Sequence, residues 1–136
     1  MRVVKELTFD AAHMLSNYKG KCNNLHGHTY KVRIELVTPV ANDMVIDFNE
    51  IKSFFNDRFD HAIVLAGDGA RDRAENALYD WVTTWHKKYY VMPKDMRPTA
   101  ENMALIVATY FKETYNTDHV GIQIWETPTS YAEEMV

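Results

Sequence analysis

Three histidines near the N-terminus have the residue types and spacing of a metal site. His26 and His28 are separated by one glycine, and His13 lies upstream of them. If this segment is extended, His26 and His28 project from one face, because the side chains of a strand alternate between its two faces. Two imidazoles on one face and a third from a neighbouring segment give three ligands and an open position. That set is typical of catalytic zinc centres.

The only cysteine, Cys22, lies between His13 and His26 and leaves two kinds of site open. As a fourth ligand it would complete a closed Cys-His₃ site that only stabilises the fold. Left uncoordinated, and close to a cation or an imidazolium, it can form a thiolate that acts as a base or a nucleophile. The spacing fits both alternatives.

The composition predicts a single domain over residues 1–136, long enough to bury about two-thirds of its unfolded surface without disulfides. A single cysteine cannot form an intramolecular disulfide, so we expect a cytoplasmic protein. No apolar run approaches the ~20 residues of a membrane span, and Met1–Glu6 lacks a signal-peptide core, so no membrane association is expected. The net charge of −4 and the lack of a basic stretch argue against nucleic acid as a partner.

Alternating apolar side chains predict the strands that must position these residues. Residues 2–9 form a strand that delivers His13 beyond its end, and the clearest strand spans residues 28–38. Residues 119–125 predict a last strand. The charged residues 132–136 are expected to fray.

Helical spacing of apolar residues characterises three further segments. Helices are predicted over residues 47–59, 71–88 and 99–114, with a short strand at residues 89–92. Asp47 and Thr99 have the side chains that accept hydrogen bonds at helix N-caps. Strands and helices occupy separate parts of the chain, so we expect an α+β fold with helices packed on one face of an antiparallel sheet.

Six separated elements, in order and over almost the whole chain, resemble the 6-pyruvoyl-tetrahydropterin synthase and 6-carboxy-tetrahydropterin synthase family. They are Phe9-Asp-Ala-Ala-His13, Cys22-Asn-Asn-Leu-His26-Gly-His28-Thr-Tyr30, Met44-Val-Ile-Asp47-Phe48, Asp60-His61, Pro98-Thr-Ala-Glu-Asn102 and Trp125-Glu126-Thr127. The resemblance implies the tunnelling fold, in which the sheets of several subunits close into a barrel. It also implies a homo-oligomer, a hexamer made of trimers, with active sites at the subunit boundaries.

The same resemblance assigns roles to particular residues. It implies that zinc (Zn2+) is the cofactor and that its ligands are His13, His26 and His28. It implies that Cys22 is the catalytic base, with Asp60 and His61 as its relay. Glu126 would anchor the pterin ring of the substrate and join the relay, and Thr99 would help to hold the ring.

The resemblance also implies a substrate, 7,8-dihydroneopterin triphosphate. A lyase of queuosine (7-deazaguanine) biosynthesis converts it to 6-carboxy-5,6,7,8-tetrahydropterin with release of acetaldehyde and triphosphate. The short gap between Cys22 and His26, and the proline before Thr99, resemble the bacterial carboxy-forming enzymes. Two alternatives stay open: 6-pyruvoyl-tetrahydropterin synthase activity, and a non-catalytic protein of the same fold that binds pterin or metal.

Two features depart from the family pattern. Asp43 stands where the family usually has a glycine before the Met-Val-x-Asp-Phe element, which affects the geometry of that turn. Residues 67–95 form a longer segment than compact members have. Within it, Trp81 and Trp85 are expected to pack within the chain. The alternative is that they form an added contact between subunits.

Overall fold

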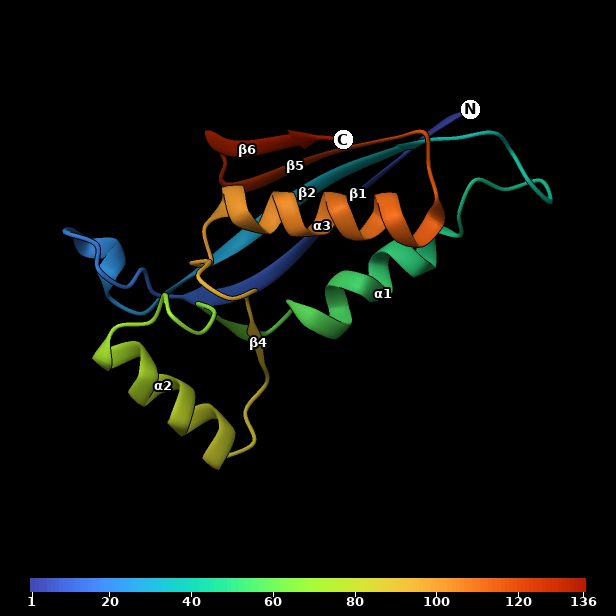
Figure 1. The fold of residues 1–136 in the computed structure, drawn as a ribbon. Coiled ribbons are helices and arrows are strands. Elements are labelled where there is room, and N and C mark those ends of the chain that lie inside the picture. Colours follow the sequence, from blue (N-terminus) through green and yellow to red (C-terminus); the bar gives the residue numbers. More distant parts are fainter.

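A six-stranded sheet forms the frame of the protein, in the order β4-β3-β1-β2-β5-β6 (Figure 1). The computed structural model describes all of residues 1–136. The strands are β1 (Arg2–His13), β2 (His26–Val37), β3 (Ala62–Leu65), β4 (Tyr89–Val91), β5 (His119–Thr127) and β6 (Ser130–Met135). The helices are α1 (Phe48–Arg58), α2 (Arg73–Thr84) and α3 (Ala100–Tyr115), with a short 3₁₀ turn at Lys21–Asn23. The predicted α+β class is confirmed.

β1 and β2 form one long antiparallel hairpin, and both strands extend further than the apolar pattern predicted. They pair without interruption from Arg2 opposite Val37 to His13 opposite His26. Residues 10–13 belong to β1 instead of following it, and β2 begins earlier than predicted. The pattern missed these ends because small or polar side chains replace the large apolar ones there, while the pairing of the two strands continues.

One face of the sheet carries the core. On β2 the alternate residues Tyr30, Val32, Ile34 and Leu36 are buried, and α1 and α3 lie across this side (Figure 1). α3 contacts β5 and β6, while α1 contacts β1. We call the side that these two helices cover the inner face, and the opposite side the outer face.

The sheet is mixed, although the strand pattern predicted an antiparallel one. β1, β2, β5 and β6 are antiparallel neighbours, but β3 runs parallel to both β1 and β4. A parallel pair needs a crossover connection, and α2 lies in the segment between β3 and β4. This segment therefore adds a parallel unit to the edge of an antiparallel sheet.

The C-terminal residues form β6, so the expectation that residues 132–136 fray was wrong. The chain reverses after Thr127, and β6 pairs antiparallel with β5. The rings of Trp125 and Tyr131 face each other across the two strands, with centroids 4.2 Å apart. Aromatic cross-strand pairs of this kind stabilise a sheet.

Polar side chains begin two helices where predicted. Asp47 accepts a hydrogen bond from the Asn49 N–H at the start of α1, and Thr99 accepts one from the Asn102 N–H at the start of α3. Asp43, in the place of a family glycine, has a φ of 66°. Aspartate adopts this left-handed conformation more readily than most residues. The turn therefore forms without the glycine.

The helix predicted over residues 71–88 is shorter in the structure, where α2 spans Arg73–Thr84. Only two residues of α2, Glu75 and Val82, are buried. Trp81 and Trp85 of this region are 47% and 64% exposed. Ordinary packing within one chain therefore does not account for these tryptophans. None of the helices is long and apolar enough to cross a membrane.

Phe55 tests the core described above, because it is fully buried and stacks on Phe9. Its truncation leaves a cavity, so we expect Phe55→Ala to lower the free energy of unfolding by about 3–5 kcal/mol. Phe48 of the same helix is 46% exposed, and Phe48→Ala should cost less than about 1 kcal/mol. Urea unfolding followed by circular dichroism measures both variants. Equal losses in the two would contradict this arrangement of the core.

Candidate metal centre and active site

The register of the hairpin brings the three predicted ligands together. His13 lies directly opposite His26, and His28 lies opposite Ala11. All three side chains project from the inner face, since His26 and His28 alternate in step with the buried Tyr30. Their ligand nitrogens lie within 4.8 Å of one another. We call these residues the histidine cluster.

Two of the rings are oriented by backbone carbonyl groups. His13 Nδ1 lies 2.7 Å from the carbonyl oxygen of Pro98, and His26 Nδ1 lies 2.7 Å from that of Asn24. A carbonyl oxygen only accepts hydrogen bonds, so each Nδ1 carries the proton and each Nε2 presents a lone pair. The two Nε2 atoms are 3.1 Å apart.

Two lone pairs at this distance repel each other unless a cation lies between them. Nitrogen ligands at about 2.0–2.1 Å from a tetrahedral zinc ion are about 3.4 Å apart, close to the 3.1 Å between the rings of His13 and His26. Hydrogen bonds from the other ring nitrogen to carbonyl oxygens are also the usual support of metal-bound histidines. The donor set therefore fits a zinc ion.

Burial favours the neutral form of two of the imidazoles, which is the form that binds a metal. Burial lowers the pKa of His13 to about 4, against the hydrogen bond to Pro98, which acts to raise it. Burial also lowers the pKa of His28, although the nearby charge of Glu126 acts the other way. Both rings are therefore unprotonated at neutral pH even before a metal binds.

Glu126 lies beside the histidine cluster at the end of β5. Its Oε1 is 3.5 Å from His13 Nε2 and 3.6 Å from His28 Nε2. This contact was not predicted from the sequence, although the alternation of β5 indicates it, because Glu126 follows the buried Ile122 and Ile124 on the inner face. Glu126 also lines a pocket of about 100 Å³ at the start of α3. Its carboxylate can thus face both the histidines and a ligand.

Cys22 lies in the 3₁₀ turn before β2 and is half-buried. The Leu15 N–H donates to its carbonyl oxygen at 3.0 Å, and the Asn23 side-chain amide donates to the Leu15 carbonyl oxygen at 3.0 Å. The histidine cluster does not include the sulfur. Of the two alternatives for Cys22, this arrangement favours an uncoordinated thiol over a fourth ligand.

Asp60 and His61 lie on the other side of the sheet. Asp60 Oδ2 is 2.9 Å from His61 Nδ1, and Asp60 Oδ1 accepts a hydrogen bond from the Asp10 N–H. That backbone bond is the main cause that lowers the pKa of Asp60, and His61 adds to it. Asp10, Asp60 and His61 form a second cluster. Asp10 projects from the outer face, because the buried Phe9 and Ala11 on either side of it project from the inner face.

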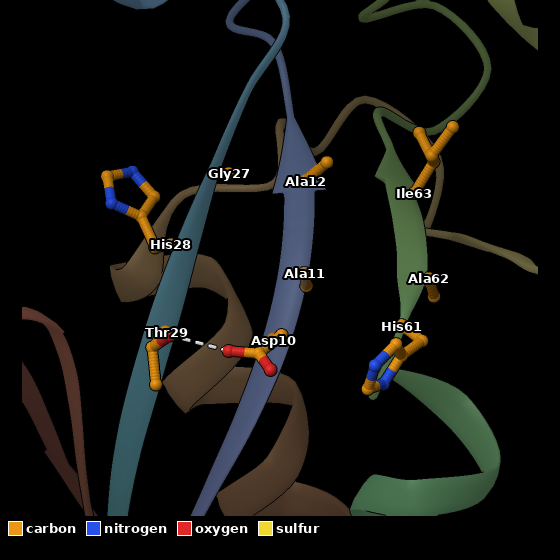
Figure 2. Close-up of a pocket in the computed structure, with 9 residues that line it drawn as sticks. All are labelled: Asp10, Ala11, Ala12, Gly27, His28, Thr29, His61, Ala62 and Ile63. Carbon is orange, nitrogen blue, oxygen red and sulfur yellow. Dashed lines mark hydrogen bonds between the residues drawn. The ribbon is translucent and has the colours of Figure 1, made fainter.

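A shallow pocket of about 470 Å³ lies over β1, β2 and β3 next to this second cluster (Figure 2). The Thr29 hydroxyl donates to Asp10 at 2.5 Å across the hairpin. Figure 2 shows the His28 ring turned away from the side chains of Asp10 and His61. The sheet thus lies between the histidine cluster and the Asp60–His61 pair, and no hydrogen bond joins that pair to Cys22.

The Pro98–Thr99 segment links α3 to the site. The Pro98 carbonyl oxygen holds His13, and the Thr99 hydroxyl oxygen accepts the Asn102 N–H at 3.2 Å. Thr99 therefore acts as an N-cap, and its hydroxyl still carries a proton that it can donate to a ligand.

Sequence relatives cover nearly the whole chain. The profile of the family described as 6-pyruvoyl tetrahydropterin synthase matches residues 2–135. The 6-carboxy-5,6,7,8-tetrahydropterin synthase of Haemophilus influenzae is 35% identical over 97% of this chain and 96% of its own. The protein of the same name from Rickettsia felis is 30% identical over 98% of this chain and 99% of its own.

Solved structures share the fold. A catalytic-residue variant of Plasmodium vivax 6-pyruvoyltetrahydropterin synthase matches with a TM-score of 0.68 and 17% identity, over 100% of this chain and 97% of its own. The 6-pyruvoyl tetrahydropterin synthase of Caenorhabditis elegans matches with a TM-score of 0.61 and 22% identity, over 100% and 95%. The fold and the sequence relatives agree, and the chain belongs to the 6-pyruvoyl tetrahydropterin synthase family.

Proposed function

We propose that this protein is a zinc-dependent 6-carboxy-5,6,7,8-tetrahydropterin synthase. It would convert 7,8-dihydroneopterin triphosphate and one water molecule to 6-carboxy-5,6,7,8-tetrahydropterin, acetaldehyde and triphosphate. The observation that carries the proposal is the histidine cluster, in which two rings have Nδ1 bound to a carbonyl oxygen and Nε2 left for a metal. The names of relatives at 35% and 30% identity support the choice of product.

The histidine cluster would hold the zinc ion. Three neutral imidazoles leave the ion its full positive charge, and the bound ion would supply a Lewis acid for the hydroxyl oxygens of the substrate side chain. The carbonyl groups of Asn24 and Pro98 keep two rings oriented for this purpose.

Cys22 and Glu126 would move protons and orient the substrate. As a thiolate, Cys22 would accept a proton from the substrate side chain beside the pterin ring. The Glu126 side chain is 33% exposed beside its pocket, and its carboxylate can accept two N–H bonds from the amino-amide edge of a pterin. The Thr99 hydroxyl would donate to the same ring.

Asp60 and His61 would serve Cys22 of a second copy of the chain. Their side chains lie on the outer face, across the sheet from the histidine cluster. The pocket beside Glu126 measures only about 100 Å³ in one chain, whereas ligand pockets commonly hold about 300–1,000 Å³. A site shared between copies accounts for both observations.

Two open edges of the sheet support an assembly of this kind. β6 is an edge strand, and β1 pairs with β3 only at Ala11 and Ala12, so most of β1 is unpaired on that side. Such edges favour pairing with another chain. We propose that copies of this single-domain chain close a barrel as trimers and that trimers form a hexamer. The assembly would act in the cytoplasm, where its product enters queuosine (7-deazaguanine) biosynthesis.

Incubation of the purified protein with 7,8-dihydroneopterin triphosphate, followed by mass spectrometry, tests the reaction. We expect 6-carboxy-5,6,7,8-tetrahydropterin and acetaldehyde, no product after chelation of the metal, and recovery when zinc is restored. A 6-pyruvoyl product would support the activity that gives the family its name. No new pterin at all would leave a protein that binds pterin or metal without catalysis.

Substitutions of Cys22 and His28 separate proton transfer from metal binding. Because the histidine cluster does not include Cys22, Cys22→Ala should keep its zinc and its fold while kcat falls by about 10²–10⁴-fold. His28→Ala removes a ligand and should lose both zinc and activity. Metal analysis of the purified variants measures their zinc content, and circular dichroism measures whether they are folded. Loss of zinc from Cys22→Ala would instead establish a closed Cys-His₃ site.

A shared site predicts that two inactive variants restore each other. Cys22→Ala and His61→Ala should each have little activity as pure proteins. After co-expression with different tags, about a quarter of the shared sites combine an intact Cys22 with an intact His61. Activity should therefore return to about that fraction of the wild-type value. If each site lay within one chain, the mixed oligomers would be no more active than the separate variants.

A further inference from the structure

One buried carboxylate lies outside the site and has no part in the proposed reaction. Glu75 of α2 is fully buried, although α2 stands apart from the helices that cover the core (Figure 1). Burial raises the pKa of Glu75, and a buried carboxylate is costly unless its oxygens are hydrogen-bonded. The partners of these oxygens therefore indicate its role.

Each oxygen of Glu75 accepts a hydrogen bond from a different segment. The Ser16 hydroxyl donates to Oε1 at 2.5 Å, and the Ala66 N–H donates to Oε2 at 2.7 Å. Ser16 is also fully buried, and its hydroxyl oxygen accepts the Asp72 N–H at 3.0 Å. Glu75 thus joins the turn after β1 to the end of β3 and to the start of α2.

These contacts differ from those that the position of Glu75 in its helix predicts. Asp72 is the N-cap of α2 and accepts the Glu75 N–H. In a capping box, a glutamate at this position bonds back to the N–H of the N-cap residue. Here the Ser16 hydroxyl takes that N–H, and the Glu75 carboxylate reaches Ser16 and Ala66 instead. The Glu75 carboxylate therefore contacts the turn after β1 instead of the backbone of its own helix end.

Ser16 belongs to the loop that carries Cys22. Its neighbour Leu15 donates its N–H to the Cys22 carbonyl oxygen, and the Leu15 carbonyl oxygen accepts the Asn23 side-chain amide. Ser16, Leu15 and Cys22 therefore form a short connected path from α2 to the 3₁₀ turn that bears the thiol.

We propose that Glu75 is a positioning residue that fixes, through Ser16, the loop of residues 14–25 and hence the place of Cys22. The inference rests on the proposed function of Cys22 as the catalytic base. It gives the longer segment of residues 67–95 a role, because the helix of that segment holds the catalytic loop from outside the site.

Alkylation by iodoacetamide tests this directly, because Cys22 is the only cysteine of the chain. Glu75→Gln keeps the side-chain shape but replaces one acceptor oxygen with a donor, and Ser16→Ala removes the hydroxyl. We expect Cys22 to react about five-fold faster or more in both variants, because the loop opens more often. With dihydroneopterin triphosphate, kcat should fall by about 10- to 100-fold at little changed KM and full zinc content. The double variant should be no worse than the more affected single variant.

Val82→Ala is the matched control. Val82 is fully buried on the same helix but its side chain takes no part in these hydrogen bonds. The Val82→Ala substitution should lower the melting temperature and leave both the alkylation rate of Cys22 and kcat at the wild-type value. Wild-type alkylation rates in Ser16→Ala and Glu75→Gln would overturn the proposal, and so would an equal acceleration in Val82→Ala. If Glu75→Gln does not fold, Ser16→Ala decides alone.

Failure of the proposed function gives a different result. In that case the wild-type protein turns over no substrate, while the alkylation rates still decide whether Glu75 and Ser16 hold the Cys22 loop.

Discussion

Both the core and the candidate metal centre follow from the antiparallel register of β1 and β2. With His13 opposite His26, all the imidazoles of the histidine cluster leave the sheet on the inner face. A slip of one residue would turn the side chains of one strand to the other face. The same register places Tyr30 and Leu36 in the core. One set of backbone hydrogen bonds therefore determines both the packing of the core and the assembly of the candidate metal centre.

Two backbone carbonyl groups complete that centre, one from a near neighbour in the chain and one from a distant segment. Asn24 precedes β2 and Pro98 precedes α3, and each accepts a ring N–H of a histidine. These bonds select the tautomer of His13 and His26 before any metal binds. Burial acts in the same direction, since it lowers the pKa of His13 and keeps the ring neutral. Backbone hydrogen bonds and burial therefore both favour ring forms that can bind a cation.

Cys22 and the Asp60–His61 pair are held by different parts of the structure. Cys22 lies on a loop that is bonded through Ser16 to Glu75 of α2. The Asp60–His61 pair lies on the outer face, held by the backbone of β1. A division of this kind suits a site that is completed between copies, because each copy presents different groups on different surfaces. The shared site that we propose would also account for the small pocket beside Glu126 in a single chain.

Local sequence patterns were sufficient to predict the features that depend on near neighbours. These are the helix starts at Asp47 and Thr99, the alternation of the long strands and the projection of His26 and His28 from one face, and each follows from side chains within a few residues of one another. The packing of the whole chain set the full length of β1 and β2, the parallel pairing of β3, the existence of β6, and the place of Glu126 beside the histidines. It also decided the burial of Glu75, whose partner Ser16 lies 59 residues away. The physical reason is that strand pairing and buried hydrogen bonds join segments far apart in the chain, and no local pattern records which segments meet.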